Sequence, residues 1–272
     1  MATRKGIREQ NRDLLERLHR ATAGPFSAAK AAELLSLSRE RARRLLAYFA
    51  SRGWLSRVRR GTYVTVPLGA TVPSKWRADP WTVAHEAFSP CYIAGWSASE
   101  HWELTEQIFR SIVVITCASI RKRERRIQGT VFILKSLREE MHFGTRSVWR
   151  KQTRVRVSDP SRTVVDILDD PEIGGGIRHC ADVVAAYFES EYRSDEELLK
   201  YIERRGNRTV LKRLGYLIEA LDIDAPDVIG RCRAGQSKGI SALDPTVAGG
   251  GRIVKRWNLR VNVTIGVSKE RL

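Results

Sequence analysis

The sequence predicts an α+β fold in two parts: a small basic domain of three helices and a β-hairpin, followed by a larger mixed α+β domain. Residues 1–66 have the apolar spacing of helices and then of two short strands. Residues 80–272 contain strands, then a block of helices, then strands, which is typical of the α+β class. Positive charge is concentrated in the first part, with 15 Lys and Arg against 5 Asp and Glu in residues 1–66 and 33 against 26 in residues 67–272.

The overall composition is that of a basic globular protein. The 272 residues carry a formal net charge of +17, and 37 of the 48 basic residues are arginine. Guanidinium groups suit phosphate oxygens and base edges, so nucleic acid, an acidic partner and an anionic membrane surface are the candidate partners. No apolar run reaches the ~18 residues of a transmembrane helix, and the first residues lack the apolar segment of a secretory signal. We therefore expect a cytoplasmic protein without membrane contact.

Three helices are predicted at the N-terminus. The first covers residues 6–20. Ser27 is a good N-cap for a second helix over residues 28–35, and Ser38 caps a third helix that ends near residue 52. Small residues in the second helix permit a close crossing with the third, as a helix-turn-helix requires.

A β-hairpin follows the third helix. Residues 54–58 and 62–66 alternate like strands, and the segment Arg59-Arg60-Gly61 between them is a basic turn. With the preceding helices, residues 6–66 resemble the winged helix-turn-helix family of DNA-binding domains. The resemblance implies that the start of the third helix enters the major groove and that the hairpin contacts phosphate or the adjacent minor groove.

This geometry nominates a set of DNA contacts. Arg39, Arg41 and Arg43 are expected at base edges, because Arg pairs with guanine there, and Arg44 at a base or a phosphate. The expected DNA-binding residues of this domain are Ser38, Arg39, Arg41, Arg43, Arg44, Arg57, Arg59, Arg60 and Tyr63. The alternative is that these arginines only solvate a surface helix.

Residues 67–79 contain Pro and Gly with little periodicity and are interpreted as a linker. The larger domain, residues 80–272, should then contain several strands and a helical block. Expected helices are residues 81–88, one from about 97, 160–170, 177–189, 195–204 and one capped by Asn207; expected strands are 111–117, 130–134, 153–157, 253–254 and 259–265.

Three groups of segments in this domain are similar to AbiEi, the antitoxin of a type IV toxin–antitoxin family. They are YIAGWSA (92–98) with HWELTEQ (101–107); DPSRTVVDIL (159–168) with GG (174–175) and KRLGYL (212–217); and LDP (243–245) with GR (251–252) and RWNLRVN (256–262). Their order and spacing, rather than any one of them, carry the resemblance, which covers most of the chain.

The resemblance implies a transcriptional autorepressor that binds inverted repeats in double-stranded DNA of its own promoter. It also implies a functional link to a nucleotidyltransferase toxin, which such antitoxins oppose without forming a stable complex. A stand-alone winged-helix regulator without a toxin is the alternative, because the sequence says nothing of a neighbouring gene.

A second basic cluster lies between two predicted strands. It consists of Arg121, Lys122, Arg123, Arg125 and Arg126. It is either a solvated hairpin tip or a phosphate-contacting loop that extends the DNA footprint.

No enzyme is expected. The chain has none of the GxxxxGK[ST], GxGxxG, GxSxG or HExxH motifs, and its four cysteines lie far apart, without zinc-finger spacing. We expect no metal, no cofactor and reduced, mostly buried thiols. Glu100, Glu103 and Glu106 could serve a winged-helix-targeted nuclease, but their spacing also fits a solvent-exposed helix face. The pair Asp169-Asp170 is expected to be a solvated helix end.

Overall fold

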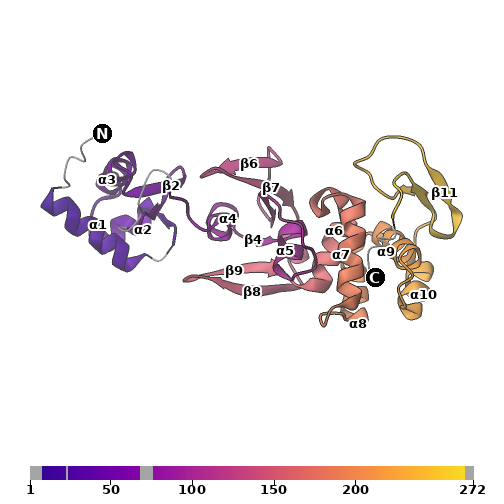
Figure 1. The fold of residues 1–272 in the computed structure, drawn as a ribbon. Coiled ribbons are helices and arrows are strands. Elements are labelled where there is room, and N and C mark those ends of the chain that lie inside the picture. Colours follow the sequence, from indigo (N-terminus) through magenta and orange to yellow (C-terminus); the bar gives the residue numbers. More distant parts are fainter. Residues whose placement is uncertain (1–7, 23, 68–75, 267–272) are drawn as a thin grey trace.

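The computed structural model describes residues 8–22, 24–67 and 76–266. The chain runs along an elongated molecule, with the N-terminal helices at one end, a six-stranded sheet in the middle, and a helical bundle with a small sheet at the other end (Figure 1). The predicted α+β class is confirmed. None of the helices in the described ranges has the length and apolar character needed to cross a membrane.

Residues 8–67, here called the N-terminal unit, fold as three helices and a three-stranded antiparallel sheet. The elements are α1 (Glu9–Ala21), β1 (Phe26–Ser27), α2 (Ala28–Leu35), α3 (Arg39–Ser51), β2 (Leu55–Arg59) and β3 (Thr62–Thr65), with the strand order β1-β3-β2. Both predicted caps form: the Ser27 hydroxyl accepts a hydrogen bond from the Lys30 amide at 3.1 Å, and that of Ser38 from the Arg41 amide at 3.2 Å. This is the element order expected of a winged helix-turn-helix.

The central unit, residues 76–158, is built on the six-stranded sheet. Its elements are α4 (Pro80–Phe88), β4 (Cys91–Ile93), α5 (Gly95–His101), β5 (Ser111–Thr116), β6 (Glu124–Ile127), β7 (Thr130–Ser136), β8 (Thr145–Arg150) and β9 (Thr153–Ser158). The strand order is β6-β7-β5-β4-β9-β8. The sequence predicted the inner strands β5, β7 and β9 but missed β4, β6 and β8. Strand β4 has only three residues, all buried, so it shows no apolar alternation. Strands β6 and β8 lie at the edges of the sheet, where the side chains are mostly polar and exposed, so the apolar alternation that marks a strand is absent there too.

The remaining residues form a helical bundle capped by a small sheet. The helices are α6 (Pro160–Asp169), α7 (Ile177–Glu189), α8 (Asp195–Arg205), α9 (Arg208–Ala220) and α10 (Pro226–Gly235), and the strands are β10 (Ser241–Ala242), β11 (Arg252–Val254) and β12 (Leu259–Val261). The sequence did not predict α10, and β12 is shorter than the expected strand over residues 259–265. Asp159 caps α6 and Ser194 caps α8, as expected. The four cysteines are free and three of them are buried.

The N-terminal unit packs directly on the central unit. Val58 and Val64 of the wing strands belong to the same buried apolar cluster as Trp81 of α4 and Val155 of β9. In addition, the Gln128 side-chain amide donates a hydrogen bond to the Ser56 hydroxyl at 2.8 Å. Of the predicted linker, residues 68–75 lie outside the described residues, and its far end packs on the central unit, where Ala78 is buried.

Candidate nucleic-acid interface

Helix α3 has one buried and one exposed side. Ala42, Leu46 and Phe49 recur at helical spacing and are fully buried against the rest of the N-terminal unit. Arg39, Arg41, Arg43 and Arg44 are exposed. The apolar stripe thus fixes the orientation of the helix and turns its basic residues towards solvent, as the sequence predicted.

The charges on α3 are mostly uncompensated. Arg44 pairs with Glu40 at 3.7 Å, but both side chains are at least 75% exposed, so water screens this contact strongly. Within the described residues, Arg39, Arg41 and Arg43 form no ion pair. A cluster of unpaired guanidinium groups at a helix start produces a positive field that attracts phosphate.

The three wing arginines differ in their surroundings. Arg57, Arg59 and Arg60 are all exposed at the hairpin. Arg59 donates a hydrogen bond to the Thr62 hydroxyl at 3.3 Å, and its charge acts on Glu86 of α4. Burial raises the pKa of Glu86, and the positive charges of His85 and Arg59 oppose that rise. The hydrogen bond to Thr62 and the nearby Glu86 make Arg59 a weaker candidate for DNA than Arg60.

Tyr63 is a correction to the predicted interface. Its side chain is only 6% exposed and packs in the apolar core of the N-terminal unit with Leu15, Phe26 and Leu55. On β3 it lies opposite Phe26 of β1 and Arg57 of β2. The short strand could not reveal that both of its faces are covered, Tyr63 by the helices of the N-terminal unit and Val64 by the central unit.

The second basic cluster is divided between a loop and an edge strand. Its residues Arg121, Lys122, Arg123, Arg125 and Arg126 are exposed, but Arg125 and Arg126 lie in β6, paired antiparallel to β7 at the edge of the sheet. Arg123 is held by two acidic groups, with its guanidinium 2.9 Å from Asp170 and 2.7 Å from Glu172. Arg121, Lys122 and Arg123 lie in the loop before this edge strand, and Arg123 is already neutralised.

The predicted carboxylates do not converge on a common point either. Only Glu100 lies in α5; Glu103 follows its end with a φ of 56°, and Glu106 is in the loop beyond. The carboxylate of Asp169 is not a solvated helix end: it bonds to Lys135 at 2.7 Å, Arg205 at 2.9 Å and Asn207 at 2.8 Å. No group of three or more His, Cys, Asp and Glu side chains suited to a metal ion occurs in the described part of the chain.

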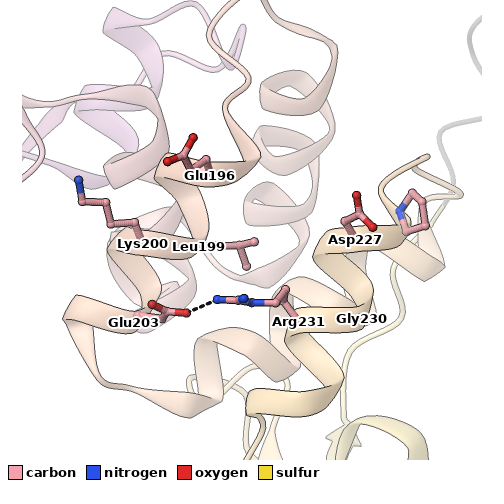
Figure 2. Close-up of a pocket in the computed structure, with 8 residues that line it drawn as sticks. Glu196, Leu199, Lys200, Glu203, Asp227, Gly230 and Arg231 are labelled. Atoms are coloured by element: carbon pink, nitrogen blue, oxygen red, sulfur yellow. Dashed lines mark hydrogen bonds and ion pairs between the residues drawn. The ribbon is translucent and has the colours of Figure 1, made fainter.

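A groove between α8 and α10 lies at the opposite end of the molecule from α3. Figure 2 shows Glu196, Lys200, Glu203 and Arg231 along it, with an ion pair of 2.6 Å between Glu203 and Arg231. The charges are mixed and partly paired, so the groove lacks the positive excess that marks a nucleic-acid site. The start of α3 and the exposed wing arginines remain the best candidate interface.

Comparison with known proteins found a similar family and a similar solved structure. Residues 13–66 match a family model described as "Transcriptional regulator, AbiEi antitoxin". The solved structure of the RV2827C protein from Mycobacterium tuberculosis is similar in fold, with a TM-score of 0.62 and 16% sequence identity over 93% of this chain and 92% of that one. No curated protein matches the sequence.

The family match covers the part of the chain that carries the candidate interface. It begins in α1 and ends just after β3, so it includes α3 and the whole wing. The similarity to the mycobacterial protein concerns the fold alone, but it extends over nearly the whole chain. The N-terminal region, residues 13–66, is thus similar to the AbiEi antitoxin family of transcriptional regulators.

Proposed function

We propose that the protein is a sequence-specific DNA-binding repressor of its own promoter that acts as a type IV antitoxin. The observation that carries the proposal is the set of exposed arginines without ion pairs, Arg39, Arg41 and Arg43, at the start of a helix whose opposite side is locked into the core. In this proposal α3 enters the major groove, and Arg57 and Arg60 contact the backbone beside it.

The electrostatic part of the proposal is tested by salt. Binding of the full chain to a labelled duplex from upstream of its own gene is measured by fluorescence anisotropy. If the protein makes 6–10 phosphate contacts, the affinity falls by roughly 10³–10⁵ between about 50 and 200 mM salt. An affinity that hardly changes over this range would contradict a DNA site built on arginine.

The specific part is tested by Arg43→Ala. A lost base contact weakens binding to the specific duplex by about 1–3 kcal/mol and relaxes the base preference at one position. Arg233→Ala in α10 is the matched control, because it removes one exposed positive charge at the far end of the molecule. An equal loss for Arg43→Ala on scrambled duplex would make Arg43 a phosphate contact instead.

The antitoxin part concerns a nucleotidyltransferase toxin. We propose that the protein opposes such an enzyme in the cytoplasm, is not itself an enzyme, needs no cofactor, and forms no stable complex with the toxin. Co-expression of the full chain with a nucleotidyltransferase encoded next to its gene should restore growth, without co-purification of the two proteins. Absence of rescue, with normal repression of the promoter, would favour the alternative of a stand-alone regulator.

A further inference from the structure

The β8–β9 hairpin carries a second concentration of positive charge. Residues 145–158 include Arg146, Arg150, Lys151, Arg154 and Arg156 and contain no Asp or Glu. Within the described residues none of these five side chains forms an ion pair. Arg150 and Arg146 lie over the rings of Trp81 and Trp102, at 4.1 Å and 5.4 Å from the ring centres, which holds their charge without neutralising it. The hairpin is therefore a positively charged element in its own right, outside the N-terminal unit.

The strand register sorts this hairpin into two faces. Trp149 lies directly opposite Arg154, and Ser147 directly opposite Arg156, so these four side chains share one face. Val148 and Val155 share the other face and pack on the apolar core under α4. Because that second face is anchored, the first is presented on a supported surface. We call Trp149, Lys151 and Arg154 the hairpin tip.

Trp149 is the unusual residue of the hairpin tip. Its side chain is 70% exposed, whereas Trp81 is 6% exposed and Trp257 is fully buried. It lies on β8, an edge strand that pairs only with β9. A large exposed aromatic side chain beside unpaired cations is typical of a surface that stacks on a flat, negatively charged ligand.

The inner end of the same face differs in charge. Arg156 is half-buried and lies near His142. Burial lowers the pKa of His142, Arg156 and Arg162 lower it further, and the negative charge of Glu139 opposes them. Glu139 thus offsets part of the positive charge there. Lys151 and Arg154 of the hairpin tip form no ion pair within the described residues, so unpaired positive charge lies beside the exposed ring.

From this juxtaposition we infer that the hairpin tip binds single-stranded nucleic acid, with the Trp149 ring stacked on an unpaired base and Arg154 and Lys151 holding the flanking phosphates. Every base has an aromatic face, so such stacking requires no particular sequence. A duplex fits less well, because its bases are already stacked on one another. This is a separate binding function from that proposed for α3, which addresses duplex DNA with a different unit of the protein.

The test measures binding of the full chain to labelled oligothymidylate and oligouridylate, alongside the promoter duplex. Trp149→Ala should weaken binding to the single strands by roughly 5- to 100-fold, the range expected for one lost base stack, and Trp149→Phe should retain most of the affinity. Arg154→Ala should weaken binding and lower the salt slope by roughly 0.7, as expected for one phosphate contact on a single strand. None of these variants should change binding to the duplex, which also shows that they are folded.

Two control variants test whether binding of single strands depends on the hairpin tip, rather than on α3 or on any exposed apolar side chain. Ile108→Ala changes an exposed apolar side chain, 84% exposed, elsewhere on the central unit and should leave binding to single strands unchanged. Arg43→Ala should weaken duplex binding only. A wild-type protein that binds the single strands but not the promoter duplex would overturn the proposed repressor function. The inference about the hairpin tip would stand.

Three results would overturn the inference itself. They are a wild-type protein that does not bind either oligonucleotide, a Trp149→Ala variant that binds both as tightly as the wild type, and polyglutamate that competes as well as oligonucleotide at equal charge. The last result would assign the hairpin tip to an acidic protein surface. Preference for oligouridylate over oligothymidylate, or the reverse, supports the site and identifies the strand as RNA or DNA.

Discussion

At the scale of single residues, two variants of Tyr63 test whether its side chain stabilises the core or contacts DNA. Because its ring is buried among the helices, Tyr63→Ala should lower the free energy of unfolding by about 3–5 kcal/mol, as for other large aromatic side chains. Tyr63→Phe keeps the ring and should leave affinity for the promoter duplex unchanged. Urea denaturation and anisotropy titrations measure the two effects. A tenfold loss of affinity in Tyr63→Phe, with unchanged stability, would return Tyr63 to the interface.

Asp169 gives a prediction for the dependence of stability on pH. Burial alone would raise the pKa of its carboxyl group, but Lys135, Arg205 and Asn207 outweigh burial and lower this pKa to about 2. A group with a lowered pKa in the folded state stabilises the protein above its unfolded pKa near 3.8, and this contribution is lost as the pH falls towards 2.

Asp169→Asn should therefore cost about 2 kcal/mol at neutral pH, from roughly 1.4 kcal/mol per pKa unit, and almost nothing near pH 2. Denaturation of variant and wild type across this range measures the difference. Asp182→Asn, which changes an exposed carboxylate on α7, is the control and should have little effect at any pH. A cost that stays constant down to pH 2 would show that packing rather than charge is lost.

At the scale of elements, a glycine in α9 makes room for the segment that contains Trp257. Gly215 lies directly against the ring of Trp257, which is fully buried and donates a hydrogen bond from its indole nitrogen to Glu219 at 2.6 Å. A Cβ at residue 215 would occupy the space of the ring. The sequence segments KRLGYL and RWNLRVN, which carry part of the family resemblance, thus meet in this contact.

Gly215→Ala should lower the free energy of unfolding by about 1–3 kcal/mol or more, because the ring must shift to make room. Gly230→Ala is the matched control: it also lies within a helix, α10, but its Cβ would meet open space. This control should be neutral or stabilise the protein by up to about 1 kcal/mol, since alanine favours helix. Thermal denaturation compares the two, and equal effects would contradict a specific role for the glycine.

At the scale of the whole molecule, the wing strands link two units that the sequence separated. Val58 and Val64 pack with Trp81 of α4, so the N-terminal and central units should stabilise each other. Val58→Ala and Val64→Ala should each cost roughly 1–3 kcal/mol. Hydrogen exchange should become faster in both β3 and α4.

Val247→Ala, which shortens a side chain that is 44% exposed, provides the comparison and should leave exchange in both elements unchanged. Faster exchange confined to the wing would mean that the two units are stable independently. Such an outcome would favour a linker that lets the DNA-binding unit move.

The buried polar residues show how a family motif can be structural. In the segment DPSRTVVDIL, Arg162 is fully buried; its guanidinium donates to Asp166 at 2.9 Å and to the Tyr92 hydroxyl at 3.0 Å, and it stacks on Phe143. Asp159 of the same segment caps α6. These residues therefore hold α6 against the sheet, and their place in the resemblance reflects fold rather than DNA binding.

The sequence by itself determined the helices of the N-terminal unit, both serine caps, the strands β5, β7 and β9 and the exposed arginines of α3, because local spacing and capping fix these features. Only the tertiary structure decided that both faces of β3 are covered, that the charge of Arg59 acts on Glu86 of the central unit, and that residues 124–127 and 145–150 are edge strands. Those properties depend on contacts between residues far apart in the chain. The exposed ring of Trp149 beside Arg154 is of the same kind: strand pairing brings the two side chains together on one face, and no local pattern predicts that the face is left uncovered.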